Sequence, residues 1–261
     1  MNMNMKKMLF LFALCAILAL TGGAQEVLRG EPLQPMGHDE LVADRLKDFF
    51  TRQDNERFDP AFTPDPARWV ALDLAPLCNM GVFGGDGPKC PVQLPFMRTG
   101  NRTFYGVPCR LIDPAANDGR DAVALASARL QPKILPDTVT IPVGRRLEQL
   151  YVLLASYYTS AGGEQFFRLD YADGSHHLFP VVGKVDTGDW WHPDTRVYSA
   201  TTRCVLAPAA EASKTTFRNL HLIRRDNPHP EKEIAGVTIK TDRAGEMAFL
   251  VVAVTGYAAG E

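Results

Sequence analysis

The chain has 261 residues, 46% of them hydrophobic, and a formal net charge of −2 at pH 7. Its 28 lysines and arginines are outnumbered by 30 acidic residues, whereas nucleic-acid-binding domains carry a concentrated basic excess. The composition therefore excludes a typical nucleic-acid-binding protein, and the length fits one β-rich domain with an extension.

Residues 1–24 have the pattern of a cleavable secretory signal peptide. Lys6 and Lys7 precede an apolar run at 8–20, and the small residues of 21–24 follow it. This run is shorter than the roughly 20 residues that a membrane-spanning helix needs, which argues against a membrane anchor. We expect a mature chain that begins near Gln25, has no transmembrane segment, and is secreted or periplasmic.

Residues 25–68 read as a tether before the main domain. Within it, 38–53 (HDELVADRLKDFFTRQ) places its apolar side chains on one helical stripe, which predicts a short amphipathic helix. This helix either packs on the domain or acts as a spacer. The segment 54–68 contains three prolines and indicates a Pro-rich extended linker.

From Trp69 the chain changes to short apolar or alternating segments separated by Gly, Pro, Asn and Asp. The Asp173-Gly174 pair suits a tight hairpin turn, and 150–158 (LYVLLASYY) is apolar on both faces, as in a strand covered on each side. Such spacing, without a long helical period, predicts an all-β fold over 69–256: an antiparallel β-sandwich of jelly-roll type. Strands are expected within 69–74, 122–130, 138–143, 150–158, 165–172, 176–182, 197–207, 216–224, 236–240 and 248–256.

Four cysteines follow the expected leader: Cys78, Cys90, Cys109 and Cys204. An even number in an exported chain favours disulfides, and we expect Cys78–Cys90 and Cys109–Cys204 from the three possible pairings. A zinc site is the alternative, but it calls for closely spaced CxxC-type pairs that the chain lacks.

Several phrases, taken in order, resemble a family of exported bacterial β-sandwich domains with a galactose-binding-like fold, often found beside glycoside hydrolases. The phrases are WVALDLAPLCNMGV (69–82), LPFMRTGNRTFYGVPCRLIDPAANDGRDAVAL (94–125), TIPVGRRLEQLYVLLAS (140–156), LDYADG (169–174), DWW (189–191) and NPHPEKEIAGVTI (227–239). The resemblance covers about 69–256 and implies a non-catalytic sandwich with a role near carbohydrate. The chain departs from the family at Ser156, where a His is usual, and at Arg225-Asp226, where an aromatic residue often precedes NPHP.

The segment 186–193 (DTGDWWHP) holds two of the three tryptophans. Neighbouring side chains on an extended segment point to opposite faces, so one indole anchors the core and the other is left to stack on a sugar. The resemblance gives the structural position to Trp190, and Trp191 is then the candidate ligand-side ring. His192, Arg196 and Tyr198 complete the candidate ligand site, with Arg196 donating hydrogen bonds to hydroxyl groups.

Asp186 and Asp189 are weak metal candidates, because calcium prefers several oxygen ligands in one loop. The DxDxDG pattern is missing, however, and Asp before Gly is mainly turn chemistry, so we expect no cofactor, with a structural calcium as the alternative. The sequence also lacks a GxSxG elbow and an HExxH helix, and we assign no catalytic residue.

We therefore expect an exported, non-catalytic module that binds a polysaccharide or a cell-surface glycan. One alternative is a polysaccharide lyase or hydrolase on the concave face of the sandwich, built from Tyr157, Tyr158, Arg168, Arg196 and Tyr198. Another is an adhesion or assembly module that binds a protein partner. Apolar, exposed edge strands or an exposed apolar face of the 38–53 helix would favour this last reading.

Overall fold

The computed structural model describes residues 49–84, 93–95, 97–129, 135–159, 164–191, 199–208 and 217–260. All of them belong to one compact unit within 46–261. The expected leader (1–24), and the tether as far as residue 48, lie outside the described residues. In the described part of the chain, no helix is long and apolar enough to cross a membrane.

Two antiparallel sheets form most of this unit, which confirms the predicted all-β sandwich. The six-stranded sheet has the order β1 (Trp69–Ala71), β12 (Ala248–Ala258), β6 (Leu147–Tyr157), β10 (Phe217–Asp226) and β9 (Thr202–Pro208), and β4 (Val123–Ala124) also pairs with β12. The four-stranded sheet has the order β5 (Thr138–Arg145), β11 (Ile234–Lys240), β7 (Phe166–Tyr171) and β8 (His176–Pro180). The connections that the structure describes contain three short 3₁₀ helices: η1 (Pro66–Arg68), η2 (Ala75–Leu77) and η3 (Pro114–Ala116).

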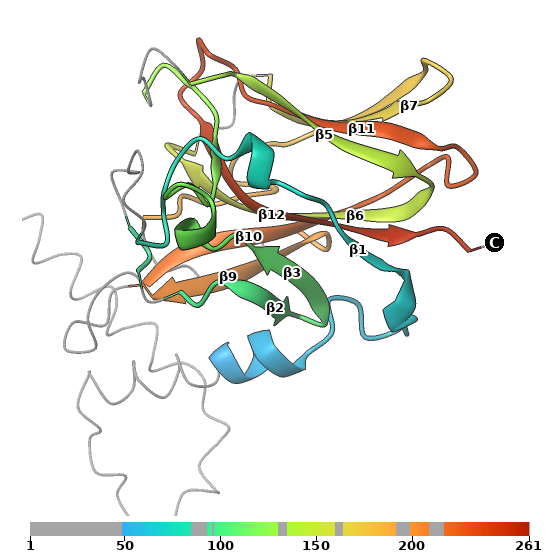
Figure 1. Ribbon diagram of the computed structural model, residues 1–261, viewed down its shortest axis with the longest axis horizontal. Coiled ribbons are helices and arrows are strands. Elements are labelled where there is room, and N and C mark those ends of the chain that lie inside the picture. The colour runs from blue at the N-terminus through green and yellow to red at the C-terminus, as the bar shows by residue number, and fades with distance from the viewer. Residues whose placement is uncertain are drawn as a thin grey trace, which may run out of the picture. The chain divides into compact units, whose positions relative to one another are not determined.

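The six-stranded sheet is the middle layer (Figure 1). On β6, Leu150 and Val152 belong to the core shared with the four-stranded sheet, while Tyr151 and Leu153 belong to a second core on the opposite face. The two sets alternate because successive side chains of a strand point to opposite faces. This arrangement confirms that the predicted strand is covered on both sides over 150–157, whereas Tyr158, just after β6, is 50% exposed.

The second core is covered by a hairpin of β2 (Gly100–Phe104) and β3 (Val107–Leu111), which the strand pattern did not predict. Its two-residue turn places Tyr105 at φ 51° and Gly106 at φ 74°, the left-handed geometry that suits tight hairpins. The usual Asn-Gly or Asp-Gly signal is replaced by Tyr-Gly, so the turn is hard to recognise. The Asp173-Gly174 hairpin between β7 and β8, by contrast, forms as predicted, with Gly174 at φ 84°.

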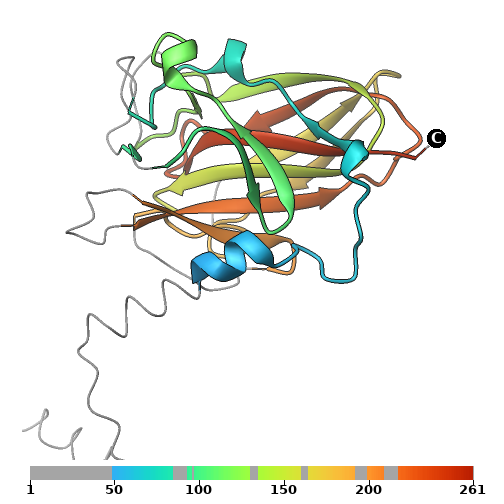
Figure 2. The same cartoon turned by 60° about the horizontal axis from the view of Figure 1, so that its bottom comes forward.

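Residues 49–55 are helical and lie along the outer edge of β9, on the same side of the sheet as the β2–β3 hairpin (Figure 2). Gln53 Oε1 accepts a hydrogen bond from Leu206 N at 2.9 Å, and Tyr105 Oη donates one to Cys204 O at 2.9 Å. Phe49 packs against Cys204 and Leu206. Unpaired strand edges invite association with other chains, so the described part of the expected 38–53 helix covers such an edge.

The Pro-rich segment 54–68, expected as an extended linker, lies against the sheet. Phe58 is 3% exposed and belongs to the second core, and the Phe62 ring contacts the Tyr257 ring with centroids 5.1 Å apart. Two phenylalanines among the prolines give this segment apolar anchors, so packing extends to residues before Trp69.

The expected disulfides are wrong for the described cysteines. Cys109 lies in the core beneath β2–β3, whereas Cys204 packs against Phe49 and Leu206, and the two are not joined. Cys78 is a buried free thiol in the core between the sheets, which contradicts the Cys78–Cys90 pairing. Cys90 itself lies outside the described residues. Distance along the chain gave no information on which core each cysteine enters, and packing in separate cores keeps Cys109 and Cys204 apart.

Candidate functional site

Trp190 is a core anchor, as expected. Its amide nitrogen donates to Ser156 O at 3.0 Å, and its carbonyl accepts from Asn219 N at 3.0 Å. The residue thus lies between β6 and β10, just beyond the point where those strands stop pairing. The indole is 1% exposed and packs against the Tyr157 ring, with centroids 4.4 Å apart. With hydrogen bonds on both sides of its backbone, Trp190 also fixes the direction of the next residue.

Trp191 points to the surface, with 49% of its area exposed. Its amide nitrogen donates to Asp189 Oδ1 at 2.9 Å, so a side chain two residues earlier holds the backbone at this turn. The Arg218 guanidinium carbon lies 4.2 Å from the indole centroid, a distance typical of a cation–π contact. Trp191 is therefore an exposed aromatic ring held in place by its neighbours.

Arg218 lies on β10 and has few polar partners. Its Nη1 donates to Phe217 O at 3.0 Å, while its Nε is buried and makes no hydrogen bond with any residue that the structure describes. Among the residues that the structure describes, no carboxylate lies within ion-pair distance of this guanidinium. Burial lowers the pKa of Arg218, as expected when a cation loses water without gaining a counter-ion.

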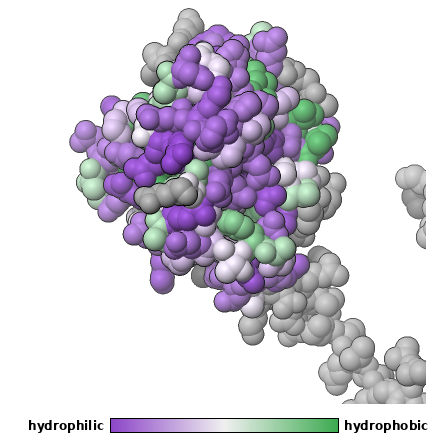
Figure 3. Space-filling model, turned by 90° about the vertical axis from the view of Figure 1, so that its right-hand side faces the viewer, coloured by the Kyte–Doolittle hydropathy of each residue, from purple (hydrophilic) through white to green (hydrophobic). Residues whose placement is uncertain are grey.

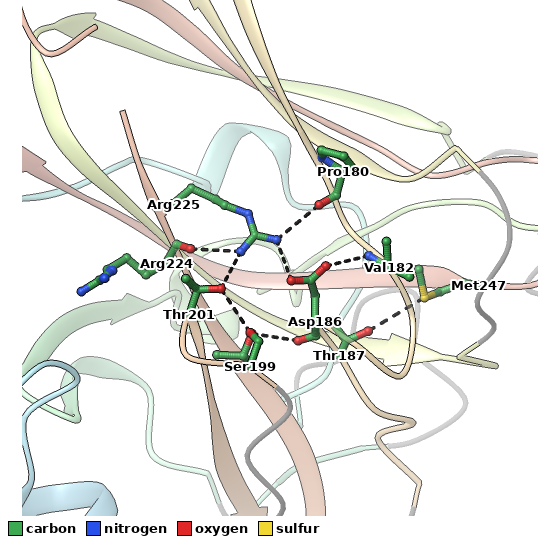
Figure 4. Close-up of polar contacts among 10 residues, drawn as sticks. Pro180, Val182, Asp186, Thr187, Ser199, Thr201, Arg224, Arg225 and Met247 are labelled. Atoms are coloured by element: carbon green, nitrogen blue, oxygen red, sulfur yellow. Dashed lines mark hydrogen bonds and ion pairs between the residues drawn. The ribbon is translucent and has the colours of Figure 1, made fainter. Parts of the chain in front are cut away.

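The loop before Trp191 is tied to β10 by a network around Asp186 (Figure 4). Arg225 Nη2 lies 3.0 Å from Asp186 Oδ1 and also donates to Pro180 O at 3.3 Å. Asp186 Oδ2 accepts from Val182 N at 2.8 Å, and the Asp186 carbonyl accepts from Thr202 Oγ1 at 2.9 Å. These contacts fix residues 180–187, and hence the segment that continues to the two tryptophans.

Both weak metal candidates are engaged in protein contacts. Asp186 uses both carboxylate oxygens in the network above, and Asp189 Oδ1 accepts the Trp191 amide. Within the described ranges, no group of three or more His, Cys, Asp or Glu side chains could hold a metal ion. These contacts give the two aspartates a structural role.

The remaining sequence-predicted site residues are His192, Arg196 and Tyr198, which lie outside the described residues. Two described residues of the enzyme alternative, Tyr157 and Arg168, are not brought together, and a third, Tyr158, is 50% exposed. Tyr157 packs on Trp190 in the second core, whereas Arg168 pairs with Asp170 at 2.7 Å on the four-stranded sheet. The two side chains thus belong to different layers of the molecule.

An aromatic pocket that the sequence did not suggest lies between the Pro-rich segment and the six-stranded sheet. Its lining includes Phe58, Phe62, Trp69, Tyr105 and Tyr151. The volume is about 60 Å³, far below the roughly 300–1,000 Å³ of pockets that enclose a small molecule. The pocket therefore has room for a side-chain-sized group and not for a whole sugar. Its aromatic residues come from segments far apart in sequence. One of these segments is 54–68, which the sequence indicated as a linker.

Asp59 lines this pocket, and its carboxylate is engaged in contacts within the protein. Its carboxylate pairs with Arg224 at 3.2 Å, and a hydrogen bond from the Ala61 amide, followed by the Arg224 contact, lowers the pKa of Asp59. The ion pair with Arg224 and the hydrogen bond from Ala61 both stabilise the packing of the Pro-rich segment.

One end of the unit, which carries the β7–β8 turn, presents a mainly hydrophilic surface with small separated apolar areas (Figure 3). Lys232 and Asp173 form an ion pair here at 2.8 Å. Large apolar patches often mark binding surfaces, so this face offers less for a ligand than the exposed indole does.

No family model matches the sequence, and neither the curated proteins nor the solved structures contain a match to it. The assignment therefore depends on the geometry of the chain itself.

Proposed function

We propose that this protein is an exported, non-catalytic module that binds a polysaccharide or a cell-surface glycan, with Trp191 as its stacking ring. The observation that carries the proposal is the contrast between Trp190, 1% exposed, and Trp191, 49% exposed. An indole offers a broad apolar face to the C–H face of a sugar. Because Trp191 is already held by Asp189 and Arg218, binding costs little conformational entropy.

A binding role is supported over an enzymatic one by the separation of Tyr157 and Arg168 into different layers. General acid–base chemistry requires its groups within hydrogen-bonding reach of one substrate. Tyr157 and Arg168 do not meet this condition, whereas stacking on Trp191 requires one exposed ring and a nearby hydrogen-bond donor.

Pull-down on insoluble polysaccharides and a glycan array test the proposal, with released sugar assayed in the same samples. We expect the wild-type protein to be retained without product, and Trp191→Ala to lose at least tenfold in retention with little change in melting temperature. Val185→Ala is the matched control, because it removes an apolar side chain that is 53% exposed on the same loop. Undiminished retention by Trp191→Ala would contradict the proposal, and sugar release would favour the enzyme.

One observation favours the protein-binding alternative. Leu178 is 43% exposed on β8, an outer strand of the four-stranded sheet. An edge strand with an apolar side chain can pair with a strand of another protein. If the wild-type protein retains no glycan, and Leu178→Lys abolishes co-purification of a defined partner, this alternative replaces glycan binding. The edge of β9 is covered and Phe49 is buried, so neither feature adds support for protein binding.

A further inference from the structure

We infer that the sugar recognised at Trp191 is acidic, and that its carboxylate or sulfate group pairs with Arg218. The inference rests on the proposed glycan binding and names the class of glycan. The observation behind it is that Arg218, beside the exposed ring, has no counter-ion among the described residues.

Seven arginines of the described residues lie within 4 Å of a carboxylate: Arg68 with Glu148, Arg110 with Asp73, Arg129 with Glu246, Arg168 with Asp170, Arg224 with Asp59, Arg225 with Asp186 and Arg243 with Asp137. Arg218 is not one of them. It makes no such pair with a described residue, and its Nε has no acceptor among these residues. A partly buried cation without a partner is unfavourable, so an incoming oxyanion would restore a missing interaction.

The guanidinium is suited to an oxyanion on a sugar. Its planar fork of N–H donors matches the paired oxygens of a carboxylate or a sulfate, and its only hydrogen bond to a described residue uses Nη1. It lies 4.2 Å from the Trp191 centroid, within the dimensions of one sugar residue. A polysaccharide that stacks on the free part of the indole therefore passes close enough for an acidic substituent, on that residue or the next, to reach Arg218.

Among the described residues of this loop, the carboxylate closest in sequence to Trp191 is that of Asp189, whose Oδ1 accepts a hydrogen bond from the Trp191 amide. It lies outside ion-pair distance of Arg218, so no carboxylate of the described residues compensates this cation. The site is thus an aromatic ring beside an arginine. An acidic sugar would supply a counter-ion to this arginine, and a neutral sugar would not.

Affinity electrophoresis with matched polymer pairs tests the inference on the wild-type protein. Polygalacturonate is compared with its carboxyl-reduced form, and dextran sulfate with dextran, so that each pair differs only in the acidic group. We expect at least tenfold tighter binding to one acidic polymer than to its neutral counterpart. The pair that responds distinguishes a carboxylate from a sulfate. Equal affinity for acidic and neutral members of both pairs would overturn the inference while leaving glycan binding in place.

Arg218→Gln then locates the effect, with Arg110→Gln as its control, because Arg110 is exposed and the two changes alter the net charge equally. We expect Arg218→Gln to lose at least tenfold in affinity for the acidic polymer and to keep that for the neutral one, while Arg110→Gln keeps both. Equal losses in the two variants would indicate nonspecific charge attraction and overturn the assignment. If Arg218→Gln fails to fold, Arg218→Lys replaces it, since it keeps the charge and loses the planar fork.

Failure of glycan binding as a whole has a different signature. A wild-type protein that binds neither these polymers nor any member of the neutral glycan panel overturns both the proposed function and this inference. Trp191-dependent binding to neutral glycans alone overturns only the acidic assignment.

Discussion

Arg225 Nη2 and Asp186 Oδ1 lie 3.0 Å apart, in an ion pair whose side chains are only 10% and 14% exposed. The pair joins β10 to the loop that presents Trp191 (Figure 4). Both charges have additional hydrogen bonds, to Pro180 O and from Val182 N. Removing one member of such a pair leaves the other charge buried without its counter-ion, which is costly.

We predict that Arg225→Met lowers the free energy of unfolding by about 3 kcal/mol, because the Asp186 carboxylate remains buried without its cation. Urea denaturation measures this loss. Arg243→Met is the control, since its ion pair with Asp137 is about half exposed and such pairs contribute about 1 kcal/mol or less. Similar losses in the two variants would show that the Asp186 pair has no special role. We also expect Arg225→Met to weaken glycan retention, because the loop before Trp191 loses its main attachment.

The two adjacent tryptophans should respond very differently to truncation. Trp190→Ala removes a buried indole from the second core, and such changes cost about 3–5 kcal/mol. Trp191→Ala removes a half-exposed ring and one cation–π contact, a loss of about 1 kcal/mol or less. Parallel urea titrations measure both values. A large loss for Trp191→Ala would mark it as a packing residue and remove the basis of the glycan site.

Much of the sandwich can be predicted from sequence, because the faces of a strand that are buried are apolar in the residue pattern. Each of the ten expected segments contains a strand, and the two-sided apolar run of β6 correctly indicated a covered middle layer. The β2–β3 hairpin escaped prediction because its turn uses Tyr105-Gly106 and because Pro108 lies within β3. Local pattern predicts an element only where the turn residues are the usual ones.

The site was only partly predictable, for a physical reason. The opposite directions of Trp190 and Trp191 follow from the geometry of an extended chain, and they were predicted. Arg218 was not singled out, because its contact with Trp191 joins residues on different segments. The wrong disulfides have the same origin, since the partner of Cys109 or Cys204 depends on which core each side chain enters.

The cysteines give a chemical test of the corrected assignment. Burial raises the pKa of both Cys78 and Cys109 to about 12, so neither thiol forms the reactive thiolate near neutral pH. We predict that iodoacetamide leaves both unmodified in the native protein and labels both in guanidinium chloride without any reductant. Peptide mass spectrometry reads out each site. Labelling that requires prior reduction would show that these residues are in disulfides after all.

Asp121 should make stability depend on pH. Its carboxylate is 0% exposed and accepts hydrogen bonds from Val82 N at 2.7 Å and Phe83 N at 2.8 Å. These bonds favour the charged form, but burial outweighs them and raises the pKa to about 6, from 3.8. Between these two values the folded protein binds more protons than the unfolded chain. The contribution of Asp121 to stability therefore falls as the pH rises through this window.

Asp121→Asn removes this titration and leaves every other group in place. A pKa shift of about 2 corresponds to about 3 kcal/mol in full, and roughly 2 kcal/mol of it should appear as a rise in the stability of the wild type relative to Asp121→Asn from pH 7 to pH 4. Urea denaturation of both proteins at several pH values measures the difference, and the titration of shared groups cancels. A constant difference, or one that grows toward pH 7, would mean that the hydrogen bonds from Val82 and Phe83 outweigh burial and keep this carboxylate charged.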